Sequence, residues 1–333
     1  MMTMTPLNEI AAKLREWEKI TLVSHRAPDG DTLGSAVALG LALRQLGKDV
    51  QFLCNDLIPK KFHFLFAPLP EWLERPEDPI AACEGRQIVT VDVADPQLLG
   101  DTLMPLAERV SIVIDHHKMS AEFGELVYRD STAAANGEII YELLRELQTD
   151  ITTEIATALY TAITTDTGCF KYMNTTPHTH EVAAKMMAYG APAADINRWM
   201  FDTISRARVE LEKLALETLE FPYDGRLVLM EISREMMKQA GASGEDVEGI
   251  NSIPRQIDGA LVGVTIRERK IGGYKISMRS QPPVDSSVIC AKFGGGGHAG
   301  AAGCVFSDSL ESVKEQLTKA VGDYFAENGI LQA

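Results

Sequence analysis

The sequence predicts an α/β protein in which a parallel sheet carries helices on both faces and a smaller α+β domain follows. In the first half, short apolar runs rich in β-branched residues alternate with helical patterns, which is typical of a covered parallel sheet. After residue 224 the pattern changes to strands joined by a tight turn. With 333 residues, the chain is long enough to bury two separate cores.

Four apolar runs of the first half are expected to form parallel strands, at residues 20–25, 49–55, 87–95 and 111–117. A helical pattern opens the chain before the first of them. Helical periodicity also predicts helices at 34–47, 136–147, 152–165 and 179–190. Gly47 and Gly190 end two of these helices, because glycine readily adopts the left-handed backbone that closes a helix.

The second half begins with a highly charged helical pattern at 193–220, which we expect to connect two domains. Strands are predicted beyond it at 226–232, 260–269 and 274–280, the last two joined by a tight hairpin over 270–273. Helices at 233–240 and 308–326 are expected to pack on these strands. The predicted division is a first domain over 1–192, a helical linker over 193–223 and a second domain over 224–333.

Charge is distributed unevenly along the chain, whose net charge is −15. The first 223 residues contain 20 basic and 33 acidic residues, a net of −13, and the remainder contains 12 basic and 14 acidic residues. An acidic first half suits a site for divalent cations, although it serves solubility equally well. The excess of acid disfavours a long nucleic acid as partner.

The five cysteines are scattered, odd in number and never spaced C-x-x-C. This pattern disfavours a disulfide framework and a thiolate zinc site, and it indicates a reducing compartment. No run of about 18 apolar residues and no secretory leader pattern occurs, so we expect no membrane span and no membrane partner. A cytoplasmic location is the expectation that remains.

Acidic and histidine side chains gather where four apolar segments end, and these residues are His25, Asp29, Asp31, Asp92, Asp115, His116, His117 and Asp166. A single Asp after a strand is most often a helix cap or turn former. Four clusters at once favour a shared site, because the carboxyl ends of parallel strands form one crevice. Imidazole and carboxylate donors suit Mn²⁺ or Mg²⁺, and eight of them suit a metal pair used in phosphoryl transfer.

The ordered motifs HRAPDGDTLGS, VDVAD, Asp115-His116-His117 and TDTGCFKYMNTTPHTHE resemble those of the DHH phosphoesterase family. FGGGGHAGAAG at 293–303 is similar to the glycine-rich signature of the family's DHHA1 domain. Length and domain content resemble the branch of oligoribonucleases and 3′-phosphoadenosine-5′-phosphate phosphatases, the nanoRNase type. The resemblance implies a metal-binding catalytic first domain and a substrate-binding second domain.

The resemblance also implies a role for each residue, with two divalent cations as cofactors, Mn²⁺ first and Mg²⁺ or Co²⁺ as alternatives. One cation is held by His25 and Asp29, the other by Asp31, His116 and Asp166, and Asp92 bridges the two. Three residues are assigned to catalysis, namely Asp92, His117 and Asp115. His117 would face the scissile phosphate, and Asp115 would orient an imidazole.

The glycine run of the second domain has three interpretations. Gly295, Gly297 and Gly300 spell G-x-G-x-x-G, but too little chain follows for a dinucleotide-binding unit. A flexible loop is the plain alternative. In the family, an Arg and a His at these places bind substrate phosphate, which implies a phosphate site made by Arg279, Gly295, Gly296, Gly297 and His298.

Basic residues also stand at the predicted hairpin, in the stretch RERK (267–270). An exposed hairpin end is the simpler interpretation of this stretch, and contact with nucleic acid is the alternative.

The function that we expect is two-metal hydrolysis of short oligoribonucleotides to mononucleotides, and of 3′-phosphoadenosine 5′-phosphate to AMP. Short RNA or a nucleotide bisphosphate is therefore the expected partner, and a homodimer is left open. Alternatives with the same site are hydrolysis of linear dinucleotides from cyclic-dinucleotide turnover or of pyrophosphate. A nucleotide sensor without catalysis is the alternative from another class.

Overall fold

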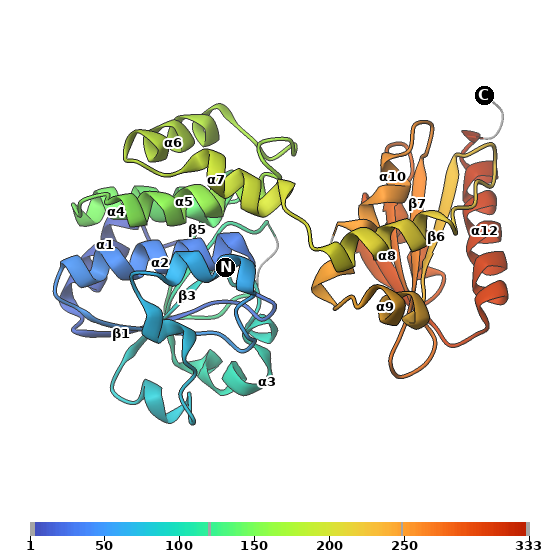
Figure 1. Cartoon of the computed structure of the whole chain (residues 1–333). Helices are drawn as coiled ribbons and strands as arrows, with labels where there is room; N and C mark the ends of the chain where they lie inside the picture. Colours follow the sequence, from blue (N-terminus) through green and yellow to red (C-terminus); the bar gives the residue numbers. More distant parts are fainter. Residues whose placement is uncertain (1–3, 119–120, 248, 331–333) are drawn as a thin grey trace. The chain divides into compact units, whose positions relative to one another are not determined.

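A computed structural model describes residues 4–118, 121–247 and 249–330, and it divides into two compact units, residues 1–203 and 204–333 (Figure 1). The change of unit falls within the stretch expected to be the linker. That stretch is not one helix: α7 (Ala193–Asn197) passes into a π-helical turn, Arg198–Asp202, and an extended Thr203 follows. The expectation of a continuous helix over 193–220 is therefore wrong, because the chain restarts at Ser205, which caps a new helix through its hydroxyl.

The first unit contains a five-stranded parallel sheet with the order β2-β1-β3-β4-β5. Its strands are β1 (Lys19–Val23), β2 (Asp49–Leu53), β3 (Gln87–Val91), β4 (Val110–Asp115) and β5 (Leu126–Arg129). The sequence predicted the first four of these strands. β5 is only four residues long and lies at the sheet edge, so its apolar signal is weak.

Both faces of this sheet are covered, as the sequence predicts (Figure 1). On one face, α1 (Leu7–Glu16), α2 (Gly30–Gln45) and α4 (Asn136–Leu147) pack on the strands. α5 (Thr153–Asp166) packs on α2 and α4, and α6 (Pro177–Ala188) packs on α5. The other face packs on α3 (Gly100–Leu103) and adjoining 3₁₀ turns. Alternate strand residues serve the two cores, with Leu22 in one and Val23 in the other. Short 3₁₀ helices lie at Lys60–Phe66, Pro70–Leu73, Ala81–Cys83, Pro96–Leu99 and Met104–Arg109.

The strand order creates a switch point between β1 and β3. From β1 the chain crosses to β2 on one side, whereas β3 lies on the other side and leads to β4 and β5. In open α/β sheets the connections diverge at such a point and leave a crevice beyond the carboxyl ends of the strands, where ligands bind. The fold alone therefore directs attention to the residues that follow β1 and β3.

The second unit is built on a mixed sheet with the order β6-β7-β8-β10-β9. Its strands are β6 (Leu227–Ile232), β7 (Val262–Glu268), β8 (Tyr274–Ser280), β9 (Gly296–His298) and β10 (Ala301–Phe306). β6 and β7 are parallel and the other pairs are antiparallel. The hairpin between β7 and β8 is the one predicted, but β9 and β10 were not predicted.

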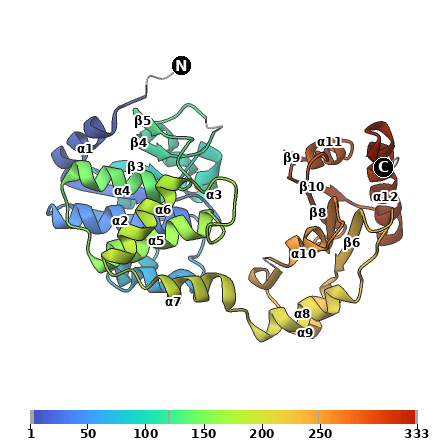
Figure 2. The same cartoon turned by 90° about the horizontal axis from the view of Figure 1, so that it is seen from above.

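Helices cover both faces of this second sheet, in its own core clusters. The helices are α8 (Arg206–Leu216), α9 (Arg234–Ala240), α10 (Ile253–Gln256), α11 (Ser286–Ala291) and α12 (Leu310–Glu327), with 3₁₀ turns at Glu245–Val247 and Ile250–Ser252. α12 packs on one face and α8 with α9 on the other, as Figure 2 also shows. Within the described residues, no helix combines the length and the apolar character that a membrane crossing needs.

Candidate functional site

The start of α2 sets two acidic side chains in different environments. Asp29 caps the helix, and its Oδ1 accepts hydrogen bonds from the backbone N–H of Asp31 (3.0 Å) and Thr32 (3.1 Å). The helix begins at Gly30, four residues earlier than the sequence predicts. Asp31 therefore lies in the first helical turn, where it is 1% exposed.

The buried carboxylate of Asp31 is held by the N-terminus of α4. Its Oδ2 accepts the N–H of Asn136 at 2.6 Å, and its Oδ1 accepts the N–H of Gly137 at 2.9 Å. Burial, together with the charges of Asp92 and Asp166, nevertheless raises the pKa of Asp31 well above its usual value. A carboxyl in this position is best ionised next to an additional positive charge.

Asp92 follows β3 directly and is buried. Its backbone has φ +62°, a left-handed conformation that is uncommon outside glycine but tolerated by Asp, and its N–H is fixed on the carbonyl of Ile114 at 2.9 Å. The Oδ1 of Asp92 has no hydrogen-bond partner among the described residues. Burial raises the pKa of this carboxyl, so the fold holds an incompletely paired acid at the switch point.

His25 follows β1, on the opposite side of the switch point. Its Nδ1 lies 2.7 Å from the carbonyl of Arg26, which turns Nε2 toward Asp92 Oδ2 at 3.5 Å and Asp29 Oδ1 at 3.7 Å. Burial alone would lower the pKa of His25. The hydrogen bonds and charges of the two carboxylates outweigh burial and raise this pKa to about 11.

His116 reaches the same site from the end of β4. Its Nδ1 lies 3.2 Å from the carbonyl of Ala133, and its Nε2 lies 3.5 Å from Asp92 Oδ1, 3.6 Å from Asp31 Oδ2 and 3.8 Å from Asp166 Oδ2. A histidine that donates Nδ1–H to a carbonyl leaves the Nε2 lone pair free for a metal. Burial, and then the charge of Asp92, raises the pKa of Asp166 to about 6, although the His116 imidazole opposes the shift.

His117 and Asp115 form a pair beside these residues. The ring Nδ1 of His117 lies 2.8 Å from Asp115 Oδ1 and 3.6 Å from Asp92 Oδ1, and its side chain is 46% exposed. The bond to Asp115 raises the pKa of His117, and the same bond lowers the pKa of Asp115 despite burial. Asp115 therefore fixes the ring orientation and favours the protonated imidazole.

The geometry of these side chains fits divalent cations. Three groups each bring three ligand atoms within 4.8 Å of one another, and these are His25 with Asp29 and Asp92, Asp31 with His116 and Asp166, and Asp92 with His116 and His117. All donors are imidazole nitrogens or carboxylate oxygens, and the Oδ1 of Asp92, which has no hydrogen-bond partner among the described residues, faces both His116 and His117. This donor set suits Mn²⁺ or Mg²⁺. The structure brings all eight predicted residues to one site, and the role of each remains a prediction.

The five residues expected to bind phosphate lie together in the second unit. His298 on β9 pairs with Ala301 on β10, which pairs with Arg279 on β8. Residues opposite one another in neighbouring strands project from the same face of a sheet, so His298 and Arg279 lie on either side of the small Ala301, with their backbones two strand spacings, roughly 10 Å, apart. Their role in phosphate binding remains a prediction.

The glycines beside His298 allow this packing. A Cβ at Gly295 would lie 2.2 Å from the carbonyl oxygen of Gly303, and one at Gly297, where φ is +146°, would lie 2.5 Å from that of Ala301. Gly296 has nothing within 4 Å of its Cβ position, so its backbone is open to a ligand. The run is therefore a short strand and turn rather than the flexible loop that was the plain alternative.

Sequence reasoning missed the backbone groups that orient the metal centre. These are the carbonyl of Ala133 at His116 and the amides of Asn136 and Gly137 at Asp31. The buried Glu138 accepts the N–H of Ala134 at 3.3 Å and so supports the peptide that holds His116. The predicted start of a helix at residue 136 was the one signal for this arrangement, because helix N-termini collect carboxylates.

Comparisons with known proteins identify the family of both units. The model of the DHH family, N-terminal domain, matches residues 19–163, and the DHHA1 domain matches residues 225–327. The bifunctional oligoribonuclease and PAP phosphatase NrnA of Thermus thermophilus is 34% identical over 335 residues, which cover 93% of this chain and 98% of that protein. The match extends through both units.

Solved structures share the fold. An exopolyphosphatase-related protein from Bacteroides fragilis has a TM-score of 0.85 at 24% identity, covering 98% of both chains. RecJ from Thermus thermophilus in complex with Mn²⁺ has a TM-score of 0.54 at 18% identity, covering 96% of this chain and 55% of RecJ. At this level of identity, the likeness concerns architecture alone.

The parallel sheet with a carboxylate and imidazole centre at its switch point defines a divalent-metal-dependent hydrolase of phosphate esters. The chain belongs to the DHH phosphoesterase family, and its second unit is the family's DHHA1 domain.

Proposed function

We propose that the chain hydrolyses short oligoribonucleotides to mononucleotides and 3′-phosphoadenosine 5′-phosphate to AMP, with two divalent cations, Mn²⁺ first, at the centre around Asp92. The observation that carries this proposal is the position of the Asp92 carboxylate. One oxygen lies 3.5 Å from His25 and the other 3.5 Å from His116, each within a separate group of ligands. The substrate class is taken from the Thermus thermophilus relative, which is named as acting on oligoribonucleotides and PAP.

The ligands of the two cations follow from these groups. His25 and Asp29 would hold one ion, Asp31, His116 and Asp166 the other, and Asp92 both. When bound, such a pair neutralises charge on a phosphoryl group and activates water for attack on phosphorus. The Mn²⁺ complex of RecJ supports manganese as the first ion to test.

Side chains of the protein then orient the substrate and assist the departure of the leaving oxygen. In our proposal the half-exposed ring of His117, kept protonated by Asp115, donates a hydrogen bond or proton to the oxygen that leaves phosphorus. Asp115 serves as a positioning residue. The backbone N–H groups of Asn136 and Gly137 hold the carboxylate of Asp31 in a fixed orientation.

In the second unit, Arg279 and His298 are proposed to bind a phosphate of the substrate. A guanidinium matches phosphate through two parallel hydrogen bonds, and the open space beside Gly296 lets a phosphate approach the backbone closely. A site that binds one phosphate next to small residues favours substrates of a few nucleotides over long strands.

The test is a product time course on an end-labelled RNA trimer, with Mn²⁺ and, in parallel, with EDTA. We expect mononucleotides to accumulate with the metal and no cleavage without it. Parallel reactions with 3′-phosphoadenosine 5′-phosphate, a linear dinucleotide and pyrophosphate rank the substrates. Release of phosphate from pyrophosphate alone would contradict the proposal, and so would tight binding of RNA with Mn²⁺ but no cleavage, which would indicate a sensor.

A further inference from the structure

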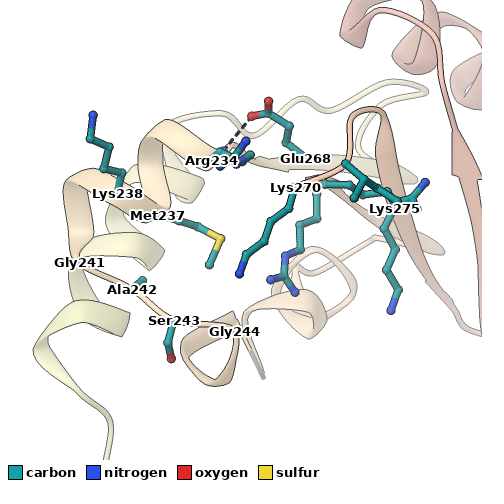
Figure 3. A pocket seen from close by; sticks show the side chains of 13 residues that line it. Arg234, Met237, Lys238, Gly241, Ala242, Ser243, Gly244, Glu268, Lys270 and Lys275 are labelled. Carbon is teal, nitrogen blue, oxygen red and sulfur yellow. Dashed lines mark hydrogen bonds between the residues drawn. The ribbon is translucent and has the colours of Figure 1, made fainter. Parts of the chain in front are cut away.

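A second charged site lies in the C-terminal unit, at the end of the β7–β8 hairpin. A cavity of about 530 Å³ opens between α9, the loop 241–244 and the hairpin residues 267–271 (Figure 3). Its volume falls in the range of small-molecule pockets, roughly 300–1,000 Å³. Neither the metal centre nor the glycine run contributes a residue to it.

The cavity is lined mainly by cations, although the chain as a whole is acidic. Its cations are Arg234, Lys238, Arg267, Arg269, Lys270 and Lys275, and its one acid is Glu268. These are six of the twelve basic residues after position 223, in a chain with a net charge of −15. Within the described parts of the chain, none of the six side chains forms an ion pair or a side-chain hydrogen bond, so no acidic side chain there neutralises their charges directly.

The frame of the cavity is fixed by backbone contacts. Glu268 accepts the N–H of Arg234 at 2.9 Å, which ties the start of α9 to the end of β7 and occupies the one acid. The N–H of Arg269 donates to the carbonyl of Gly273 at 2.9 Å and closes the hairpin. The cations therefore project from a structured turn and not from a loose tail.

Apolar groups stand among the cations. Figure 3 shows Met237 and Lys270 pointing into the space between α9 and the hairpin, while the ammonium of Lys238 points away from it. Ile271 at the hairpin tip is 82% exposed, so its side chain is accessible to a ligand in the cavity. A flat apolar ring could lie against these two side chains, with its charged part among the ammonium and guanidinium groups.

The cavity is separate from the phosphate site proposed above. Arg279 pairs with Gly263 at the start of β7, whereas Glu268 pairs with Tyr274 at the other end of the same two strands. The five steps along β7 from Gly263 to Glu268 span about 17 Å at 3.4 Å per residue. One phosphate group cannot contact Arg279 and Lys270 at once.

We propose that this cavity binds a small molecule with two or more phosphate groups joined to a nucleoside, a nucleoside polyphosphate. Several unpaired cations around one space recognise clustered negative charge, and a single phosphate would leave most of them unused. The apolar side chains Met237 and Ile271 would contact the base. The proposal goes beyond the hydrolytic function, because it needs neither the metal ions nor Asp92.

The test measures the affinity of ATP by isothermal titration calorimetry on the full chain in EDTA, so that no hydrolysis occurs. Arg269→Glu with Lys270→Glu is the test variant, and Lys213→Glu with Lys319→Glu, on the exposed faces of α8 and α12, is the control with the same change in charge. We expect the test variant to lose about tenfold or more in affinity and the control to keep it. Equal affinities in the two variants, at equal melting temperatures, overturn the proposal.

Further ligands identify the chemistry. We expect ATP to bind more tightly than inorganic tripolyphosphate, because the latter has no base to cover Met237. Equal binding of the two would overturn the nucleoside part of the proposal. An RNA trimer that binds as tightly as ATP, and loses affinity equally in the test variant, would make the cavity part of the substrate path and would overturn the proposal as a whole.

Discussion

The two units use charge in opposite ways. In the first unit, carboxylates and imidazoles converge on a buried centre, with Asp31 and Asp92 almost fully removed from solvent. In the second unit, cations lie on β8, at Arg279, and around the β7–β8 hairpin. Burying like charges costs stability unless a counter-ion compensates, whereas exposed cations cost little. The first arrangement is therefore suited to holding cations rigidly for chemistry, and the second to recognising an anionic ligand.

The largest expected effect comes from breaking the buried centre. Asp92→Asn removes the carboxylate shared between the two ligand groups, so we expect hydrolysis of an RNA trimer to fall by about 10³-fold or more. Calorimetric titration with Mn²⁺ should show fewer ions bound. Asp95→Asn is the matched control, because Asp95 lies on the same loop but only caps a 3₁₀ turn, through Gln97. Full activity in Asp92→Asn would remove the bridging assignment.

A smaller effect is expected when only the orientation of His117 changes. In Asp115→Asn the ring loses its anionic partner at 2.8 Å, and we expect kcat to fall about 10- to 100-fold with KM unchanged. Because Asp115 raises the pKa of His117, its loss lowers that pKa, so the alkaline limb of the kcat profile should move to lower pH. An unchanged pH profile with reduced kcat would indicate a structural role only.

Substitutions at the proposed phosphate site of the second unit should change the kinetics in a different way from substitutions at the metal centre. Arg279→Ala and His298→Ala remove single phosphate contacts, so we expect KM for the RNA trimer to rise about tenfold while kcat and Mn²⁺ binding stay the same. Arg206→Ala, on exposed α8, provides the control for loss of one cation. A fall in kcat at constant KM would contradict a role in ground-state binding.

The first and the second unit also differ in how much of their structure could be predicted from the sequence. Strands β1, β3 and β4 are nearly continuous apolar runs such as KITLV and QIVTV, and each of these three is followed by candidate ligands. Their convergence follows from the rule for parallel sheets, without side-chain detail. The start of α2 was predicted four residues too late, at residue 34, whereas Asp29 caps a helix that begins at Gly30.

Prediction was weaker in the second unit, where local composition disagrees with the observed structure. β10 has the sequence AAGCVF and β9 has GGH, and small residues give little strand signal. Both strands are stabilised by pairing with β8, a contact distant in the sequence. The basic stretch of the hairpin was noted from the sequence. The cavity beside the hairpin is also lined by α9, and patterns within one segment do not show that two distant segments lie together.

The smallest expected effect separates the function of the metal centre from the stability of the fold. In the metal-free protein, burial and the charge of Asp92 raise the pKa of Asp166 from 3.8 to about 6. The folded state then binds a proton that the unfolded state has released, so this stabilisation is complete below pH 3.8 and is lost as the pH rises through 6. Asp166→Asn has no charge to bury, and we expect it to be more stable than the wild type at pH 7.5.

With the side chain of Asp166 31% exposed, solvent screening reduces the expected gain to about 1 kcal/mol. Urea unfolding in EDTA should show this gain at pH 7.5 and none at pH 3.5, while the exposed Asp150→Asn changes neither. Adding Mn²⁺ should reverse the order, because the wild type then gains a ligand that the variant lacks. A variant that is less stable than the wild type in EDTA at pH 7.5 would mean that Asp166 stabilises the fold directly. The buried acids of this unit would then not be destabilising groups that a bound cation compensates.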